Sequence, residues 1–271
     1  MIGLPERGAP GEPIVSLRGV ACGYGETDVL EGIDLEVRRG EILALIGGSG
    51  SGKSTLLKTM TGLLPPRAGE VLLFGEPIYD LAPAARDALL RRTGMLFQQD
   101  ALFGSMTILD NVALPLRELT HLPAPLICEI ARMKLALVGL DGLEERLPSR
   151  LSGGQRKRAG LARASVLDPE VVFCDEPSAG LDPVLAAEID ETMLQFRDVL
   201  HVTIVAVTHE LASISAIADR AVMLADGRIR ATGSIEELTR SRDPVVHGFF
   251  HRGAGRAARG AETVLEALEE R

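Results

Sequence analysis

The sequence lacks any apolar run that approaches the roughly 18 residues that a membrane-spanning helix requires. Residues 1–13, MIGLPERGAPGEP, lack the apolar segment of a secretory signal and are expected to form a flexible N-terminal extension. Positive charge is also in deficit, because 38 acidic residues outnumber 29 basic ones and give a net charge of −9. Such diffuse acidity argues against a protein that wraps nucleic acid, and we expect no nucleic-acid partner.

Cysteine is scarce as well. The three cysteines, Cys22, Cys128 and Cys174, are widely spaced and form neither a CxxC pair nor a Cys/His set with metal-ligand spacing. We expect them to be buried, unpaired thiols of a cytosolic protein, without a redox or nucleophilic role for Cys174. What is abundant is ordinary for a globular chain: 46% of residues are hydrophobic and 25% are charged, enough for a large core.

The hydrophobic pattern predicts an α/β fold. Short apolar segments over 13–47 and 69–78 are typical of strands, whereas the spacing becomes helical after Ala84 and predicts a helical block over about 107–167. Further strands are expected at 170–176, 202–209 and 220–233, with an amphipathic helix at 185–200 between the first two. These late strands are almost wholly apolar, as in a parallel sheet that is buried on both faces.

The segment LALIGGSGSGKST reads as a strand, a glycine loop and the start of a helix. Within it, Gly47-x4-Gly52-Lys53-Ser54 fits the phosphate-binding loop of nucleoside triphosphatases. The glycines allow backbone amides to point at phosphate oxygens. Lys53 is expected to reach the β- and γ-phosphates, and the Ser54 hydroxyl to ligate Mg²⁺.

A phosphate loop also predicts an acidic partner site, and VVFCDEP supplies one at the end of a predicted strand. We expect Asp175 to hold Mg²⁺, directly or through water, and Glu176 to polarise the attacking water. Neighbouring residues on a strand point to opposite sides, so the two carboxylates cannot do the same work.

A second glycine motif, LSGGQ at Leu151–Gln155, precedes a predicted helix and offers backbone amides to another anion. One nucleotide needs only one phosphate cradle, so the second cradle requires an explanation. Together with GGSGSGKS, VVFCDEP, SAGLD and VTHE it occurs in the order and spacing of the ATP-binding-cassette ATPases, which the chain resembles over about residues 14–240.

This resemblance implies a P-loop NTPase, RecA-like, parallel-sheet core with an antiparallel β subdomain and an inserted helical subdomain. The cassette domain would span 14–248, with the helical insert at about 100–167. Two copies would sandwich two ATP molecules, each with Mg²⁺, and hydrolyse them to drive transport. In that arrangement LSGGQ serves the nucleotide of the other copy.

Other positions are carried over from the family one by one. Tyr24 matches the aromatic that stacks on adenine, although a core aromatic on a strand is the alternative. Gln98 matches the glutamine of the Mg²⁺ site, with its neighbour Gln99 as the rival. Asp182 matches a residue that crosses the dimer interface and also suits a helix N-cap, and both roles can hold. His209 matches the histidine that contacts the γ-phosphate, the alternative being a satisfied core histidine.

The predicted site residues can now be listed. Those expected at ATP are Tyr24, Gly47, Gly48, Ser49, Gly50, Ser51, Gly52, Lys53, Ser54, Thr55, Gln98, Ser152, Gly153, Gly154, Gln155 and Asp182; the catalytic pair is Glu176 and His209; and the Mg²⁺ ligands are Ser54, Gln98 and Asp175.

Within the family, LPLRELTHLPAPL, MKLALVGL, RKRAGLARASVLDPE and DPVVHGFF resemble the Mla-type and mammalian-cell-entry-type ATPases, which power phospholipid movement between two membranes. Gln155 and SAGLD depart from some members toward the general cassette pattern. Alternatives are the ATPase of a solute importer or of lipoprotein release, or a cassette protein without a transport role.

The resemblance also implies partners. Permease subunits would dock near Gln98 to Leu116 and hold the chain on the cytoplasmic side of a bacterial inner membrane, with lipid-binding periplasmic components in the same complex. Residues 249–271 would form a tail whose last part is an amphipathic helix able to contact the second copy, or a solvated end.

Overall fold

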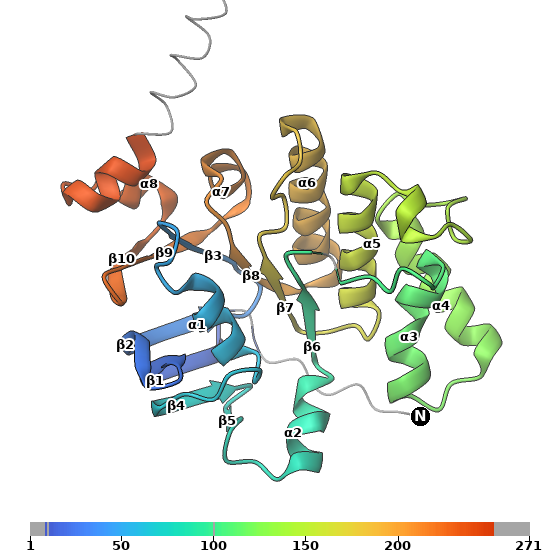
Figure 1. Cartoon of the computed structure of the whole chain (residues 1–271), viewed down its shortest axis with the longest axis horizontal. Helices are drawn as coiled ribbons and strands as arrows, with labels where there is room; N and C mark the ends of the chain where they lie inside the picture. The colour runs from blue at the N-terminus through green and yellow to red at the C-terminus, as the bar shows by residue number, and fades with distance from the viewer. Residues whose placement is uncertain (1–8, 10, 100, 252–271) are drawn as a thin grey trace, which may run out of the picture.

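The computed structural model describes residue 9, residues 11–99 and residues 101–251 (Figure 1). Most of the predicted N-terminal extension and residues 252–271 of the predicted tail lie outside the described residues. The predicted architecture is confirmed: a largely parallel core sheet, an antiparallel sheet and a group of helices make up the fold.

The core sheet has six strands in the order β10-β9-β3-β8-β7-β6. Their bounds are β3 (Ile42–Gly47), β6 (Thr93–Leu96), β7 (Val171–Asp175), β8 (Thr203–Val207), β9 (Arg220–Ala225) and β10 (Arg228–Gly233). All neighbours are parallel except β9 and β10, which form an antiparallel pair. The carboxyl ends of the parallel strands therefore meet at one edge, where open α/β sheets bind ligands.

Both faces of the core sheet are covered, which explains its unbroken apolar strands. Along β7, Val171 and Phe173 belong to the core that is shared with the antiparallel sheet. Val172 and Cys174 belong to the core that is shared with the helices. This alternation follows from the two-residue period of a strand.

The antiparallel sheet has the order β2-β1-β4-β5. Its strands are β1 (Pro13–Tyr24), β2 (Thr27–Arg38), β4 (Ala68–Leu73) and β5 (Glu76–Pro77). Helix α1 (Lys53–Met60) packs with this sheet through its buried Leu56 and Leu57. The helix thereby fixes the end of β3 against the antiparallel sheet.

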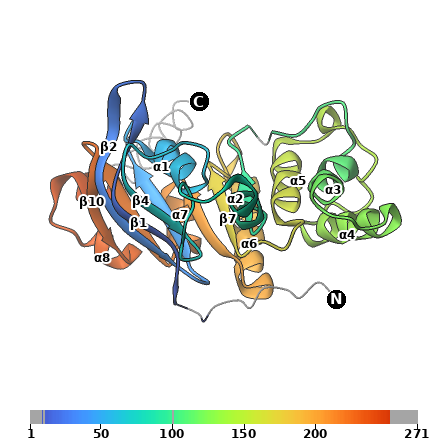
Figure 2. The ribbon, with the colours of Figure 1, turned by 90° about the horizontal axis from the view of Figure 1, so that it is seen from below.

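The helical group lies at the opposite end of the molecule from the antiparallel sheet, as both ribbon views show (Figures 1 and 2). It contains α3 (Ile108–Leu119), α4 (Ala124–Leu137), the 3-10 turn Pro148–Arg150 and α5 (Gly153–Ser165). Helix α6 (Pro183–Leu200) packs beside α5, and the two share one hydrophobic core with the sheet. Because α5 touches both the helical group and the sheet, it connects them.

Shorter helices complete the fold: α2 (Pro83–Leu90), α7 (Leu211–Ile217), α8 (Ile235–Thr239) and a helical stretch at 244–251. Phe249 and Phe250 in that stretch pack on a third small core, which includes Ala221 and Met223 of β9. Across the described part of the chain, no helix combines the length and apolarity needed to cross a bilayer.

The three thiols are free, as expected from the sequence, with Cys22 and Cys174 buried and Cys128 half-buried. Complete burial raises the pKa of Cys174 to about 12. A thiol with this pKa is protonated at neutral pH and is therefore a weak nucleophile.

Candidate functional site

The loop between β3 and α1 folds as the glycine spacing predicts. Gly47 has φ 144° and Gly52 has φ 93°, and both are backbone angles that side chains rarely allow. A Cβ at Gly47 would lie 2.3 Å from the carbonyl oxygen of Leu224, and one at Gly52 would lie 2.8 Å from Leu30. Glycine is therefore required at both ends of the loop.

Lys53 begins α1 and is buried within the loop. Its Nζ donates hydrogen bonds to the carbonyl oxygens of Gly47 and Gly48, both at 2.9 Å. Burial lowers the pKa of Lys53, whereas the nearby carboxylates Glu176 and Asp175 act to raise it. The ammonium is thus held at the centre of the loop with two carboxylates close by.

The hydroxyl of Ser54 and the carboxylate of Asp175 meet although 121 positions separate them in the chain. Ser54 Oγ donates to Asp175 Oδ1 at 3.0 Å. The contact arises because β3 and β7 both end at the same edge of the core sheet. Two adjacent oxygen donors beside a phosphate loop suit Mg²⁺, which proteins commonly hold through one or two such groups together with phosphate oxygens.

Glu176 differs from the sequence-based expectation in its backbone. The strand ends at Asp175, and Glu176 adopts φ 53°, so the two carboxylates are not successive residues on a regular strand. The Glu176 amide donates to the carbonyl of Val207 at 2.9 Å, which anchors this turn to β8. The two carboxylates therefore lie in different positions: Asp175 contacts Ser54, whereas Glu176 lines the cavity beside the phosphate loop.

His209 lies just beyond the end of β8 and contacts Glu176. Its Nδ1 is 3.0 Å from Glu176 Oε1 and 2.9 Å from Oε2. The imidazole is 60% exposed whereas the Glu176 side chain is 13% exposed. The carboxylate is therefore sheltered while the ring remains accessible.

These elements surround one cavity of about 610 Å³. It is lined by Gly47, Gly48, Ser49, Gly50, Ser51, Gly52, Lys53, Ser54, Thr55, Gln98, Glu176 and His209, together with Val29, Ala179 and Phe249. Gln98 reaches the cavity because β6, which ends two residues before it, lies beside β7. Ser51 Oγ is buried there without a hydrogen-bond partner among the described residues, so the loop still offers a polar group to a ligand.

Tyr24 does not belong to the core. It ends β1 and is 51% exposed, and Lys58 of α1 lies beside it with Nζ 3.4 Å from the phenol oxygen. An exposed ring at the edge of the antiparallel sheet is available for stacking, which a buried strand aromatic is not.

The LSGGQ residues lie apart from the phosphate-loop cavity, at the N-terminus of α5. Ser152 caps this helix: its Oγ accepts from the Gln155 amide at 3.2 Å, and Gln155 Oε1 accepts from the Ser152 amide at 3.0 Å. Asp182 caps α6 by accepting from the amides of Val184 and Leu185 at 3.0 and 3.1 Å. The capping role that the sequence allowed for Asp182 is therefore present.

Lys157 is a residue that motif reasoning did not single out. It is 4% exposed, and its Nζ donates to the carbonyl of Gln98 and lies 3.5 Å from the carbonyl oxygen of Glu176. The signal was available, because Lys157 follows LSGGQ by two residues and lies one helical turn before the buried Leu161, on the same face of α5. Phe249 was missed for another reason: only the tertiary fold brings the 244–251 helix to the cavity.

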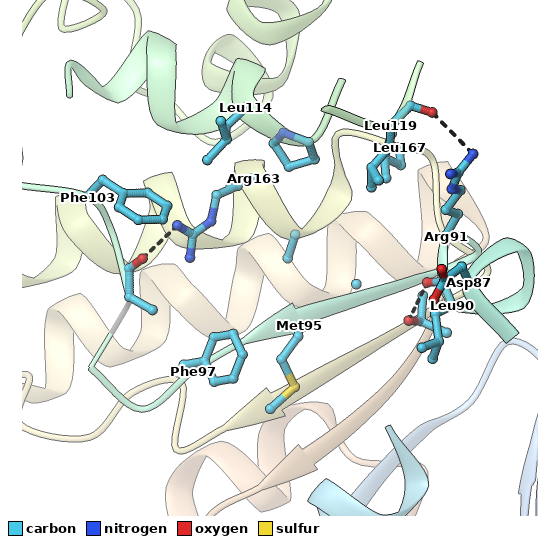
Figure 3. A pocket seen from close by; sticks show the side chains of 15 residues that line it. Asp87, Leu90, Arg91, Met95, Phe97, Phe103, Leu114, Leu119, Arg163 and Leu167 are labelled. Atoms are coloured by element: carbon cyan, nitrogen blue, oxygen red, sulfur yellow. Dashed lines mark hydrogen bonds between the residues drawn. The ribbon is translucent and has the colours of Figure 1, made fainter. Parts of the chain in front are cut away.

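A second cavity, of about 670 Å³, lies between the helical group and β6 (Figure 3). Its apolar lining includes Leu90, Met95, Phe97, Phe103, Leu114, Leu119 and Leu167. Arg163 stands in it with Nη1 donating to the Ala101 carbonyl at 2.7 Å, and Arg91 at its edge contacts the Leu119 carbonyl. Exposed Phe97 and Phe103 make this an apolar surface open to solvent with basic groups beside it.

Comparison with solved structures supports the same reading of the fold. A dimeric ATP-binding cassette, solved in a post-hydrolysis state with ADP and Pi, has a TM-score of 0.74 and 29% identity over 82% of this chain and 98% of its own. A cassette from Clostridium perfringens, part of an ABC transporter complex, has a TM-score of 0.78 and 29% identity over 86% of this chain and 92% of its own.

Curated relatives are more similar in sequence. The intermembrane phospholipid transport system ATP-binding protein MlaF of Escherichia coli is 42% identical over 237 residues, which cover 88% of each chain. A probable ribonucleotide transport ATP-binding protein of Mycobacterium leprae is 40% identical over 88% of this chain and 68% of its own. The ABC transporter family model matches residues 30–179, more than half of the chain. With the phosphate loop, the paired carboxylates and the LSGGQ helix all in place, the chain belongs to the ABC transporter family.

Proposed function

We propose that this chain is the ATP-hydrolysing subunit of a membrane transporter that moves phospholipid between the inner and outer membranes of a bacterium. One observation carries the ATPase part: a single cavity gathers the phosphate loop, Lys53, and the Glu176–His209 pair beside the Ser54–Asp175 contact. The membrane lipid part is supported by the 42% identity to a phospholipid transport ATP-binding protein.

ATP with Mg²⁺ is the proposed ligand. The loop amides and Lys53 would hold the β- and γ-phosphates, and Tyr24 would stack on the adenine from the edge of the antiparallel sheet. The oxygen donors of Ser54, Asp175 and Gln98 suit Mg²⁺, which would neutralise charge on the transferring phosphoryl group. The orphaned Ser51 hydroxyl gives the loop one more donor for a phosphate oxygen.

Glu176 and His209 are the proposed catalytic pair. Glu176 would accept a hydrogen bond from the attacking water and polarise it, since its carboxylate is sheltered and faces the cavity. His209 contacts that carboxylate and would hold it in place while its exposed ring approaches the γ-phosphate. The exposed position of the histidine favours this role over that of a satisfied core residue.

A second copy of the chain is the proposed partner at LSGGQ. The Gly153 and Gly154 amides at the start of α5 are suited to an anion, and no acidic residue occupies the first turn of that helix. The Ser152 amide would join them by exchanging its bond to Gln155 Oε1 for one to the anion. Asp182 would cross the same interface while still capping α6. The dimeric state of a cassette with similar structure supports this arrangement.

The cavity in Figure 3 is the proposed docking site for permease subunits, which would hold the chain at the cytoplasmic face of the membrane. An apolar groove with arginines beside it suits a short amphipathic helix that carries acidic residues. To test this, Phe103→Asp places a charge in the groove but lies outside the cavity of the phosphate loop. We expect the isolated chain to keep its ATPase activity and to lose co-purification with the permease; Glu145→Gln, on an exposed loop, serves as the control.

Two candidate substrates have to be compared by experiment. Relatives at 42% and 40% identity are named for phospholipid transport and ribonucleotide transport, respectively. The purified complex, reconstituted in liposomes, is assayed for ATP-dependent transfer of labelled phospholipid and of labelled ribonucleotide. Phospholipid transfer that disappears with Lys53→Ala supports the proposal. Transfer of the ribonucleotide alone contradicts the lipid part and leaves the ATPase part intact.

A further inference from the structure

A small buried cavity lies beside the turn that follows β7 and carries Glu176 and Ser178. Its polar walls come from four segments: Asp190 on α6, Ser178 on the turn after Glu176, Thr208 just after the end of β8, and Ser213 on α7. Asp190 is 7% exposed and Ser178 is 1% exposed. The volume is about 10 Å³, about one water-sized sphere.

Two polar atoms in this cavity have no partner among the described residues: Asp190 Oδ1 and Ser178 Oγ. The remaining polar groups around them are engaged, since Ser213 bonds to the Asp190 carboxyl and Thr208 Oγ1 accepts from the Glu210 amide at 3.1 Å. Buried polar atoms in native proteins nearly always have a hydrogen-bond partner, and ordered water supplies it where protein does not.

We propose that this cavity binds one ordered water molecule that bridges Asp190 to Ser178 and thereby positions the turn that carries Glu176. The Ser178 hydroxyl donates to the water oxygen, and the water donates to Asp190 Oδ1. Asp190 and Ser178 are positioning residues in this inference, because neither lines the cavity of the phosphate loop.

Residues around the proposed water lie close in sequence to both members of the proposed catalytic pair. Ser178 is two residues after Glu176, whose left-handed backbone at φ 53° depends on its surroundings to persist. Thr208, also on the cavity wall, directly precedes His209. One water therefore ties α6 to the turn that carries Glu176, beside the strand end that carries its contact His209.

The buried state of Asp190 is consistent with this bridge. Burial raises the pKa of the Asp190 carboxyl, the charge of Glu210 adds to that effect, and the bond from Ser213 opposes it. Oδ1 can accept a hydrogen bond from water in the ionised carboxylate and, as the carbonyl oxygen, in the neutral acid. The bridge thus does not depend on which form is present.

The test uses the full-length chain and measures kcat and KM for ATP, and it rests on the proposed ATPase function. Ser178→Ala and Asp190→Ala each remove one end of the bridge, and we expect kcat to fall about threefold to tenfold, the loss of roughly one hydrogen bond. KM for ATP should stay within twofold because the phosphate loop is untouched. Asp190→Asn keeps an acceptor and should retain more than half of the wild-type kcat. Glu191→Gln, on the exposed side of the same helix turn, is the matched control.

The double variant distinguishes one shared water from two separate effects. If a single water joins the two groups, Ser178→Ala with Asp190→Ala should lower kcat no further than the worse single change. Multiplied losses, an unchanged kcat in both single variants, or an Asp190→Asn variant as impaired as Asp190→Ala would overturn the bridge. An inactive wild-type chain would instead contradict the proposed ATPase function. A high-resolution crystal structure should show the water, and an empty cavity would overturn the inference.

Discussion

Glu176 shows how much of the site depends on single residues. Its carboxylate is held by an uncommon backbone angle, an amide bond to Val207 and the contact with His209. Left-handed backbone in a residue other than glycine costs free energy and persists only where neighbours enforce it. These contacts together hold the carboxylate at the wall of the cavity.

Glu176→Gln keeps the shape of this side chain and removes its charge. We expect hydrolysis to fall by about 10² to 10⁴-fold, the usual contribution of a general base, while ATP still binds. An ATP-bound dimer should then accumulate and elute early in size-exclusion chromatography. A variant that hydrolyses ATP within twofold of wild type contradicts the role of Glu176.

Lys157 extends the site beyond the motifs. Lys157→Met keeps the buried stem and removes the ammonium that contacts the carbonyls of Gln98 and Glu176. We expect kcat to fall about tenfold to hundredfold, since a hydrogen bond to a charged group contributes about 1.5–3 kcal/mol, with a smaller effect on KM. Lys134→Met is the matched control, because Lys134 is also buried but pairs with Asp168 in the helical group. Equal losses of kcat in the two variants, after correction for folded protein, would contradict the idea that Lys157 positions Gln98 and Glu176.

At the scale of elements, the core sheet is anchored at the end remote from the site. Glu170, which precedes β7, is 4% exposed and accepts hydrogen bonds from Arg39 and Arg92. The Arg92 guanidinium also lies 3.8 Å from the centre of the Phe74 ring. This cluster joins the end of β2, the start of β6 and the start of β7.

Glu170→Gln tests the stability of that junction. Its two arginines hold the pKa of the Glu170 carboxyl below its ordinary value of 4.5 despite burial. A lowered carboxyl pKa stabilises the fold above the unfolded-state pKa, and the contribution is lost as pH falls through the folded-state pKa. Losing a charged hydrogen bond costs about 1.5–3 kcal/mol, and each kcal/mol shifts Tm by about 2–4 °C.

The measurement is Tm by calorimetry or circular dichroism. At pH 7 we expect Glu170→Gln to melt roughly 3 to 12 °C below wild type, with the gap narrowing as the pH falls below about 4.5. Glu70→Gln, in an exposed pair with Arg18, should change Tm little. A gap that stays constant at acid pH is the outcome that excludes the charge-based explanation.

At the scale of the whole molecule, the chain carries two separate candidate phosphate-binding sites. The phosphate loop and the N-terminus of α5 belong to different parts of the fold, and the described cavity of the phosphate loop contains none of Ser152 to Gln155. A site that needs both must therefore be completed by a second copy. Damage at Ser152 should then act across the interface.

A mixed dimer tests this. With Ser152→Arg in one chain and Lys53→Ala in the other, both lesions fall in one composite site and the other site stays whole. With both changes in one chain and a wild-type partner, each composite site carries one lesion. The first arrangement should keep more ATPase activity, provided that one intact site turns over alone. Equal activity of the two, once single-site turnover is established, rules out the cross-chain role of LSGGQ.

Sequence reasoning located most elements because their patterns are strong. The helix at 108–119 and the buried strands β7 and β8 follow from apolar spacing alone. Strand β6 was not predicted, because Thr93–Leu96 has only four residues, too few to show an alternation of apolar and polar residues. That strand matters, because it is what brings Gln98 beside β7. Helices α7 and α8, of seven and five residues, are likewise too short for a periodic signal.

The sequence by itself determined which chemistry this protein was predicted to perform. The glycine spacing, Lys53, the Asp175–Glu176 pair and LSGGQ each predict a phosphate site from a short stretch of chain, because each of these signals is local. Only the tertiary structure decided what depends on distant residues meeting. It joined Ser54 to Asp175 across 121 positions, set Glu176 in a left-handed turn against His209, and placed Lys157 under Gln98. It also enclosed Asp190 and Ser178 around one cavity. Such contacts follow from the order of strands in the sheet and the packing of α5 and α6, which no short stretch of sequence encodes.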